Sequence, residues 1–364
     1  MNTILLNPGP VTLSAHVRQA LLGPDLCHRE SEFATLQNTL RTHLLEVYRL
    51  PPSEWAAILL TGSGTAAVEA MLTSLVPLDG KVLVLENGVY GQRMSNIAAR
   101  ARIAHTRLET LWLEGLDAAK VEANLEADRA ITHVAVVQHE TTSGRLNDLA
   151  PIAALCRRYS AELLIDGVSS FGAEDIDFAQ WPIAACAATA NKCLHGVPGT
   201  SFVVGRRAAL AAAGTPNRSV YFDLQSYLEN QDRNGTPFTQ SVQTFYALAA
   251  ALEELQVAGG WQARRALYRE RLAQVRTHLS ALGIEPLLPD SAVSCVLHAF
   301  KLPPDLSYPA LHDALKAQGF VIYAGQSTLA NQIFRISMMG EIAAPDVQRL
   351  CQVLTASIRG AVKP

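Results

Sequence analysis

The chain has 364 residues, of which 49% are hydrophobic and 17% are charged, and its formal net charge at pH 7 is −3. This much apolar material excludes an intrinsically disordered chain, and the lack of a basic run argues against a nucleic-acid-binding protein. No apolar run approaches the ~18 residues that span a bilayer, and the first residues do not resemble a secretory signal. We therefore expect a cytoplasmic protein of about two domains with no membrane association.

Cysteine and lysine usage narrows the possible chemistry. The six cysteines are scattered without a CxxC pair, which is typical of reduced thiols and not of a disulfide framework or a zinc site, so no metal is expected. Only six of the 30 basic residues are lysines. A reaction that needs an amine nucleophile therefore has few candidate positions.

Short apolar runs alternate with helical patterns from about residue 56 onward. Strands are expected over residues 56–60, 81–85, 105–108, 133–137, 161–165 and 182–190, and helices over 62–75, 91–102, 117–125 and 151–159. Continuous apolar strands separated by helices predict an α/β fold with a mostly parallel sheet that helices cover on both faces.

The pattern changes after residue 256. A long amphipathic helix is expected over 261–282, followed by strands over 293–300, 320–323 and 333–336 and by helices over 311–318 and 344–358. This order predicts a smaller α+β domain. We expect an N-terminal arm over residues 1–15, a large α/β domain over 16–256 and a small C-terminal domain over 257–364.

The candidate chemistry follows the predicted strands, because ligands of α/β sheets collect at the carboxyl ends of the strands. Ser63, Gly64 and Thr65 follow the first strand and open a helix. A glycine lets the backbone approach an anion closely, and the free N–H groups and dipole of a helix start attract negative charge. The segment is a candidate phosphate site, or alternatively an ordinary helix cap with tight-turn glycines.

Tyr90 and Asp166 follow two further strands. The ring of Tyr90 could stack on a planar ligand, or it could belong to a half-buried turn tyrosine. Asp166 comes directly after a buried strand, where a charge needs a partner. It could cap the next segment or hold a cationic ring nitrogen.

Lys192 follows a run of alanines and precedes a glycine-bearing loop. Desolvation lowers the pKa of a lysine and frees the neutral amine for Schiff-base formation, although a buried salt bridge with Asp166 is the alternative. A phosphate site, a stacking ring, a carboxylate and a strand-end amine are together what pyridoxal phosphate requires. We therefore expect this cofactor.

Several motifs carry a family resemblance, and they lie at residues 5–10 (LLNPGP), 61–70 (TGSGTAAVEA), 87–91 (NGVYG), 139–144 (HETTSG) and 192–199 (KCLHGVPG). These motifs resemble those of the class V, fold type I, pyridoxal-phosphate aminotransferases, and within them those of the 2-aminoethylphosphonate–pyruvate transaminases. The resemblance extends over nearly the whole chain. It implies a large domain with a mostly parallel seven-stranded sheet and a smaller α+β domain.

The resemblance implies a role for each matching residue. Lys192 would bind the cofactor covalently and shuttle a proton, Asp166 would pair with the pyridine nitrogen, and Tyr90 would lie over the ring. The remaining cofactor-binding residues would be Ser63, Gly64 and Thr65 at the phosphate, Thr141 near the ring hydroxyl, and Asn191 beside the lysine.

Two further matches concern the substrate and the assembly. Thr236 matches a threonine that reaches the phosphate of the neighbouring subunit's cofactor, which implies a homodimer with shared active sites. Arg335 matches the arginine that binds the keto-acid carboxylate, a task that suits a bidentate guanidinium.

The sequence also departs from the phosphonate transaminases. His28 and Arg29 stand where those enzymes carry a Trp/Asp-rich segment, and they look like the pair that phosphoserine aminotransferases use on the substrate phosphate. They would bind a phosphonate, or alternatively Arg29 would form a salt bridge with Glu30 or Glu32. Further departures, which bear on the amino donor, are Asn191 and His195 beside the lysine and Gln326 in place of a more usual lysine.

We therefore expect small-molecule substrates and the reaction of 2-aminoethylphosphonate with pyruvate to give phosphonoacetaldehyde and alanine. The alternatives are a serine– or alanine–glyoxylate type transaminase and a pyridoxal-phosphate lyase acting on a hydroxylated aminophosphonate. A nucleotide-binding α/β protein is a different class, and the absence of G-x-G-x-x-G after the first strand argues against it.

Overall fold

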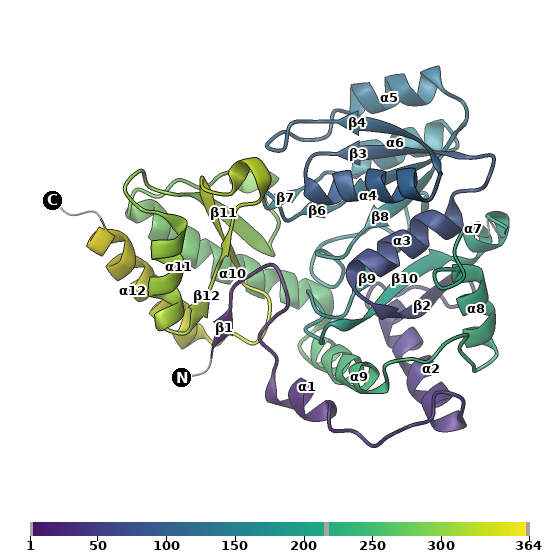
Figure 1. Ribbon diagram of the computed structural model, residues 1–364, viewed down its shortest axis with the longest axis horizontal. Helices are drawn as coiled ribbons and strands as arrows, with labels where there is room; N and C mark the ends of the chain where they lie inside the picture. The colour runs from purple at the N-terminus through teal and green to yellow at the C-terminus, as the bar shows by residue number, and fades with distance from the viewer. Residues whose placement is uncertain (1–2, 215–217, 362–364) are drawn as a thin grey trace.

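The computed structural model describes residues 3–214 and 218–361. Its largest element is a seven-stranded sheet with the strand order β2-β10-β9-β8-β5-β3-β4 (Figure 1). The strands are β2 (Trp55–Gly62), β3 (Lys81–Glu86), β4 (Ala104–Glu109), β5 (Ile131–Val137), β8 (Glu162–Asp166), β9 (Ile183–Thr189) and β10 (Gly199–Arg206). Only β10 runs antiparallel to its neighbours, β2 and β9, so the sheet is mostly parallel as predicted.

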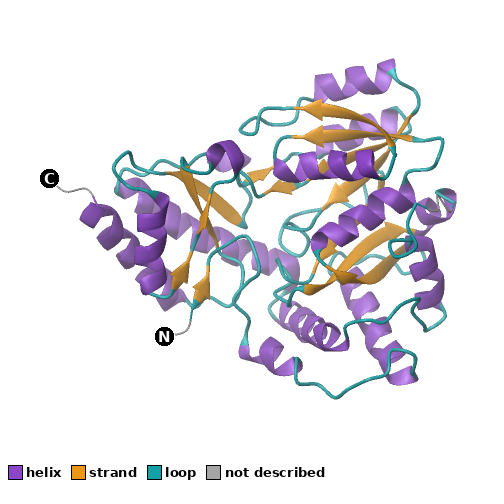
Figure 2. Cartoon of the chain, viewed as in Figure 1, coloured by secondary structure: helices purple, strands orange, loops and turns teal. Residues whose placement is uncertain are grey.

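Helices cover both faces of this sheet (Figure 2). One face packs on α2 (Ser31–Glu46), α5 (Ala118–Ala127), α6 (Ala150–Arg158) and α9 (Val242–Val257). The other face packs on α3 (Gly64–Leu75), α4 (Val89–Arg100), α7 (Arg207–Ala212) and α8 (Leu224–Asp232). The predicted α/β fold with a doubly covered sheet is thereby confirmed.

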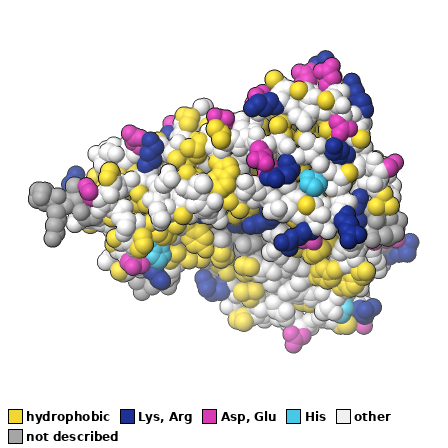
Figure 3. All heavy atoms as spheres, turned by 45° about the horizontal axis from the view of Figure 1, so that its top comes forward, with side chains coloured by type: hydrophobic (Ala, Val, Ile, Leu, Met, Phe, Trp, Pro, Cys, Tyr) yellow, Lys and Arg dark blue, Asp and Glu magenta, His cyan; other side chains and the backbone are white. Residues whose placement is uncertain are grey.

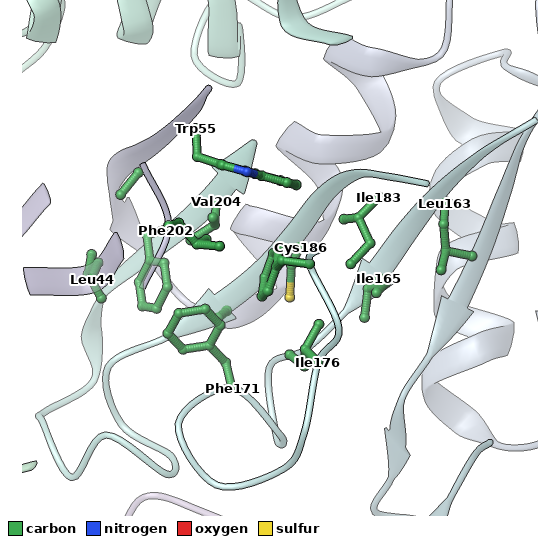
Figure 4. Close-up of a cluster of buried hydrophobic side chains, with 14 of the residues drawn as sticks. Leu44, Trp55, Leu163, Ile165, Phe171, Ile176, Ile183, Cys186, Phe202 and Val204 are labelled. Carbon is green, nitrogen blue, oxygen red and sulfur yellow. The ribbon is translucent and has the colours of Figure 1, made fainter. Parts of the chain in front are cut away.

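Successive side chains of the inner strands point to opposite faces of the sheet, and because both faces are covered these strands are continuous apolar runs. In β2, Ala57 and Leu59 point to one core, whereas Ile58 and Leu60 point to the other. All four side chains are fully buried. Figure 4 shows part of the first core, in which aromatic side chains such as Phe202 lie close to residues of the central strands.

The C-terminal part of the chain forms a second sheet, in which β11, β14 and β13 pair antiparallel in that order. Its elements are α10 (Gly260–Ala281), β11 (Leu297–Lys301), α11 (Tyr308–Ala317), β12 (Phe320–Val321), β13 (Tyr323–Ala324), β14 (Ile333–Ser337) and α12 (Ala344–Ala361). The strand predicted over 320–323 is split in two, because β12 pairs with β1 (Ile4–Leu5) and β13 pairs with β14. The N-terminal segment therefore crosses to the C-terminal part of the chain, where β1 and β12 form a separate two-stranded parallel sheet (Figure 1). The domain boundaries stay a prediction.

Four further features concern the cysteines, membrane-spanning helices, metal-binding groups and surface charges. All six cysteines are free thiols. No helix in the described ranges is both long enough and apolar enough to cross a bilayer, and no group of acidic, histidine or cysteine residues there could hold a metal ion. Basic and acidic side chains are interspersed on the face of the molecule shown in Figure 3.

Candidate active site

The candidate site residues follow neighbouring strands, and most of them meet at one edge of the large sheet. Asp166 is the last residue of β8, and Lys192 lies in the connection from β9 to β10. Ser63 precedes α3 directly after β2, and Tyr90 lies in the first turn of α4 after β3. Thr141 lies after β5 in a hairpin formed by β6 (His139–Glu140) and β7 (Arg145–Leu146).

Lys192 lies in the connection between the antiparallel strands β9 and β10, and its side chain contacts the N-terminal segment. Its Nζ donates a hydrogen bond to the backbone oxygen of Pro8. Gly9 has φ +106°, and a Cβ at this position would lie 2.6 Å from Cδ of Lys192. The LLNPGP motif therefore forms one wall around the amine. The positive φ favours glycine at this position, and a Cβ there would displace the end of the Lys192 side chain.

Burial lowers the pKa of the Lys192 ammonium to about 8, and the positive charges of Arg335 and Arg93 act in the same direction. Roughly a tenth of the amine would be neutral at pH 7 with such a pKa, against fewer than one part in a thousand for an ordinary lysine. The site thus supplies an amine that can act as a nucleophile near neutral pH.

Asp166 is buried with 6% of its surface exposed, and its Oδ1 accepts a hydrogen bond of 3.0 Å from the backbone N–H of Val168. Burial raises the pKa of its carboxyl to about 6, which the charges of Arg93 and Lys192 oppose. No ion pair joins Asp166 to Lys192 in the described part of the chain, so the alternative of a buried salt bridge is not observed. The carboxylate can therefore accept from a cationic donor of a ligand.

Thr141 has a buried hydroxyl whose Oγ1 has no hydrogen-bond partner among the described residues. Its backbone oxygen accepts a hydrogen bond of 2.7 Å from Nη1 of Arg335. A buried hydroxyl normally has a partner, because an unpaired polar group loses its hydration without compensation. The orphaned Oγ1 fits a site whose bound ligand supplies that partner.

The start of α3 fits an anion. Ser63 is the N-cap residue but makes no side-chain capping hydrogen bond. The N–H of Ala66 donates to the backbone oxygen of Ser63 at 2.9 Å, which leaves the N–H groups of Gly64 and Thr65 as donors for a ligand. A Cβ at Gly64 would lie 2.8 Å from carbons of Val168, so the backbone there packs too closely for a side chain. Thr65 Oγ1 accepts a hydrogen bond of 3.1 Å from Nη1 of Arg93.

Arg335, in β14, is 2% exposed. Its Nε donates to the backbone oxygen of Ala324 at 2.8 Å, and its Nη1 donates to Thr141 and, at 3.4 Å, to Oε1 of Gln326. Nη2 has no hydrogen-bond partner in the described ranges. Burial lowers the pKa of the guanidinium, which remains protonated at any physiological pH.

Glu140 is a residue of this site whose role the sequence reasoning missed. It is fully buried, and its Oε1 accepts from Oγ1 of Thr142 at 2.6 Å. Its Oε2 accepts from the backbone N–H groups of Tyr90 at 3.2 Å and Gly91 at 3.4 Å. Glu140 therefore caps α4 from the neighbouring strand and fixes the position of Tyr90. A contact across 50 residues has no local sequence signal.

The two residues beside the lysine serve the loop itself. Oδ1 of Asn191 accepts from Oγ1 of Thr189 at 2.9 Å. His195 is buried, and its Nε2 accepts from the backbone N–H of Gly340 at 2.8 Å and contacts the hydroxyl of Tyr268. Burial lowers the pKa of His195 well below its usual range, so the ring is neutral.

Two predicted residues are not brought to this site, and a third, Thr236, was expected at the site of the neighbouring subunit. His28 and Arg29 lie between α1 (Ala15–Ala20) and α2, where Arg29 is exposed and forms no ion pair with Glu30 or Glu32. Thr236 is buried, and its hydroxyl donates to the backbone oxygen of Phe238 at 3.2 Å and accepts from Gln240 at 2.9 Å. The Thr236 hydroxyl is therefore already engaged within its own chain.

A doubly covered α/β sheet with a strand-end lysine, a buried carboxylate and an open helix start defines the class of fold type I pyridoxal-phosphate-dependent transferases. Within that class, the chain belongs to the class-V aminotransferase family, whose model matches residues 20–350.

Relatives and solved structures agree with this assignment. The chain is 38% identical over 361 residues to the 2-aminoethylphosphonate–pyruvate transaminase of Aeromonas hydrophila, covering 97% of this chain and 94% of the relative. It is 39% identical over 354 residues to the enzyme of that name from Klebsiella pneumoniae, covering 96% of each. The pyridoxamine–pyruvate aminotransferase of Mesorhizobium loti superposes with a TM-score of 0.89 at 26% identity, covering 100% of this chain and 94% of that one.

The family implies pyridoxal phosphate, and the residues of this site fit that molecule. The uncapped start of α3 suits its phosphate, and the unpartnered Oγ1 of Thr141 suits a ring oxygen. The buried carboxylate of Asp166 suits its ring nitrogen, and the amine of Lys192 suits its aldehyde.

Proposed function

We propose that this chain is a cytoplasmic, homodimeric transaminase that moves the amino group of 2-aminoethylphosphonate to pyruvate. The support for this substrate pair is that the Aeromonas and Klebsiella relatives bear that name and align along nearly their whole length. The observation that carries the chemistry is the convergence of Lys192, Asp166 and Arg335, which come from three separate elements, around one hairpin.

Pyridoxal phosphate, when bound, withdraws electrons from the substrate carbon that carries the amino group and so makes its proton removable. We assign Lys192 the covalent attachment of the aldehyde and the transfer of that proton by Nζ. Its lowered pKa suits both tasks, because the amine must be neutral to attack and to accept a proton. Asp166 would keep the ring nitrogen protonated, and Tyr90 would cover one face of the ring.

Arg335 would bind the anionic end of each substrate in turn. Its head group is fixed by main-chain hydrogen bonds through Nε and Nη1, which leaves Nη2 for a ligand. Pyruvate offers a carboxylate and 2-aminoethylphosphonate offers a phosphonate, and a planar guanidinium accepts both. Donor and acceptor would therefore occupy the same place in the two halves of the reaction.

The dimer would complete the site from outside the subunit. The segment that resembles the family's inter-subunit threonine contains two candidates, and only Thr239 is exposed, whereas the Thr236 hydroxyl is engaged internally. We therefore assign the contact with the neighbouring cofactor phosphate to Thr239 in place of Thr236. His28 and Arg29, which do not reach their own site, would contact substrate only across the dimer.

A donor screen tests the proposed function. The purified enzyme is assayed with three donor–acceptor pairs. These are 2-aminoethylphosphonate with pyruvate, alanine with glyoxylate, and serine with glyoxylate. We expect kcat/KM for 2-aminoethylphosphonate to exceed that for either amino acid by more than about tenfold, which corresponds to ~1.4 kcal/mol of transition-state binding. The opposite preference would reject the phosphonate assignment, and ammonia release without a keto acid would indicate a lyase.

A further inference from the structure

Arg93 is a half-buried residue of α4 that touches two candidate cofactor-binding residues at once. Its Nη1 donates to Oγ1 of Thr65 at 3.1 Å. Its Cζ lies 4.7 Å from the centroid of the Tyr90 ring, one turn earlier on the same helix. This guanidinium therefore lies at the junction between the start of α3 and the stacking tyrosine.

The charge of Arg93 acts on the interior of the site. It lowers the pKa of the Asp166 carboxyl and the pKa of the Lys192 ammonium. In the described ranges Arg93 forms no ion pair, and its polar contact is with the neutral hydroxyl of Thr65. Partly buried guanidinium groups are normally paired with an anion, because desolvation of an unpaired charge is costly.

The neighbours of Arg93 are themselves suited to an anion. The first N–H groups of α3 lie beside Thr65 and are not capped by Ser63. A helix start and a guanidinium are both favourable for a phosphate, the first through N–H donors and its dipole and the second through charged, directional donors. No acidic side chain of the described residues forms an ion pair with Arg93 or caps the start of α3, and the charge of Asp166 acts on Arg93 only from a distance.

We propose that Arg93 is a phosphate-binding residue of the cofactor site, where its guanidinium and the start of α3 together hold a phosphate monoester dianion. This inference rests on the proposed function and adds to it a residue that the motifs did not single out. With this assignment, the two arginines whose charges act on Lys192, Arg93 and Arg335, both bind anions. Arg93 serves the cofactor phosphate, and Arg335 serves the substrate anion.

A structural role for Arg93 is the competing explanation, in which the guanidinium only orients the Tyr90 ring. The two roles differ in their dependence on the phosphate group. Pyridoxal has the same ring and aldehyde as pyridoxal phosphate but no phosphate. Replacing a phosphate-binding residue should weaken the binding of pyridoxal phosphate alone, whereas replacing a residue that orients Tyr90 should weaken the binding of both compounds.

The experiment measures equilibrium binding of pyridoxal phosphate and of pyridoxal to the full-length protein by visible absorbance, after the cofactor has been removed. The variants are Arg93→Gln and Arg93→Lys, and Arg100→Gln on the exposed end of the same helix is the matched control. We expect Arg93→Gln to weaken pyridoxal phosphate binding by at least about tenfold and to leave pyridoxal within about twofold. Arg93→Lys keeps the charge and should therefore lose less affinity for pyridoxal phosphate than Arg93→Gln does. Arg100→Gln should bind both compounds as the wild type does.

Equal weakening of both compounds by Arg93→Gln, or no change in either, would overturn the proposal. If Arg93→Gln fails to fold, as judged by circular dichroism, Arg93→Lys decides by the same ratio of the two affinities. A wild-type protein that binds neither compound would instead overturn the proposed function. Failure of the inference and failure of the function are therefore distinguishable.

Discussion

The backbone oxygen of Thr141 accepts a 2.7 Å hydrogen bond from Nη1 of Arg335, which lies 194 residues further along the chain. This bond ties the hairpin after β5 to β14 of the C-terminal sheet. It also means that the residue with the unpartnered hydroxyl and the residue with the uncommitted Nη2 are held in one unit. The residue proposed to bind the cofactor and the residue proposed to bind the substrate are thus joined by a direct hydrogen bond.

Replacing Arg335 by lysine should therefore weaken the binding of both substrates. Lysine has a compact charge and cannot reproduce the planar geometry that Nε and Nη1 fix through main-chain hydrogen bonds. For Arg335→Lys we expect the KM values of pyruvate and of the amino donor each to rise by about tenfold or more, with cofactor binding retained. Steady-state kinetics and visible absorbance measure the two quantities.

Arg207→Lys is the matched control, because Arg207 forms its ion pair with Asp232 on the outside of the large sheet. It should leave both KM values unchanged. A rise in the KM of only one substrate in Arg335→Lys would show that donor and acceptor anions bind at different places.

Gly9→Ala should reduce the reaction of Lys192 with the cofactor aldehyde without unfolding the protein. The substitution forces a Cβ to within 2.6 Å of the Lys192 side chain at a residue with φ +106°. We expect the fraction of protein labelled on Lys192 after treatment with pyridoxal phosphate and borohydride, measured by mass spectrometry, to fall by about tenfold or more.

Gly283→Ala separates this steric effect from backbone strain. Gly283 also has a positive φ, +76°, but a Cβ there meets nothing within 4 Å. Its alanine variant should lose about 1 kcal/mol of stability and keep normal labelling. Equal labelling in Gly9→Ala and the wild type would mean that the N-terminal segment does not confine the lysine.

The rate at which Lys192 captures an aldehyde should rise with pH through about 8. The folded protein holds the pKa of this ammonium near 8, mainly by burial, so the neutral nucleophile increases up to that pH and levels off above it. Stopped-flow absorbance after mixing cofactor-depleted protein with pyridoxal phosphate measures this rate. A rise that continues to pH 10 would show an ordinary, solvated lysine.

The sequence predicted the local parts of this molecule better than the contacts between distant segments. Continuous apolar strands are expected wherever both faces of a sheet are covered, and β2, β3, β5, β8 and β9 follow that pattern, whereas the edge strand β4 is polar and partly exposed. The antiparallel strand β10 was not predicted, because its short connection from β9 contains no crossover helix. That same short connection carries Lys192, so the missed strand is one of the two that flank this residue in the chain.

The chemical type and position of the candidate site residues could be predicted from the sequence, but the contacts that hold them in place could not. Lys192 and Thr141 each follow a strand and lie in a motif, and Asp166 is the last residue of a buried strand. The contacts of Lys192 with Pro8 and of Glu140 with Tyr90 join residues 184 and 50 positions apart. Such pairs depend on how the strands are ordered in the sheet, and no periodicity in one sequence reports that order.

Glu140 should make stability depend on pH in the direction opposite to that of an ordinary carboxylate. Burial raises its pKa to about 7 from a usual 4.5, so the folded state binds more protons than the unfolded state between these values. The stability contributed by the protonated form is complete below about 4.5 and is lost as the pH rises through about 7. Glu140→Gln removes this titration.

Chemical denaturation at pH 5 and at pH 7.5 measures the effect. Relative to the wild type, Glu140→Gln should show a smaller loss of unfolding free energy between the two pH values, by roughly 1 to 3 kcal/mol. Glu122→Gln is a matched control on the surface, where Glu122 pairs with Arg158, and should follow the wild type. An unchanged pH dependence in Glu140→Gln would place the proton on another group.

The two threonines near residue 240 give the sharpest test of a shared active site. Thr239 is exposed, whereas the hydroxyl of Thr236 is engaged with Phe238 and Gln240. Thr239→Ala should weaken pyridoxal phosphate binding severalfold and leave stability unchanged. Thr236→Ala should keep the affinity and cost about 1 kcal/mol of stability, as expected for lost internal hydrogen bonds.

Mixed dimers then show from which subunit the hydroxyl comes. A Lys192→Ala subunit paired with a Thr239→Ala subunit has one site that combines the intact lysine of one chain with the intact threonine of the other. If Thr239 acts across the dimer, this site binds pyridoxal phosphate with wild-type affinity at half stoichiometry. If Thr239 acts within its own chain, every lysine-bearing site keeps the weakened affinity, which would contradict the shared site.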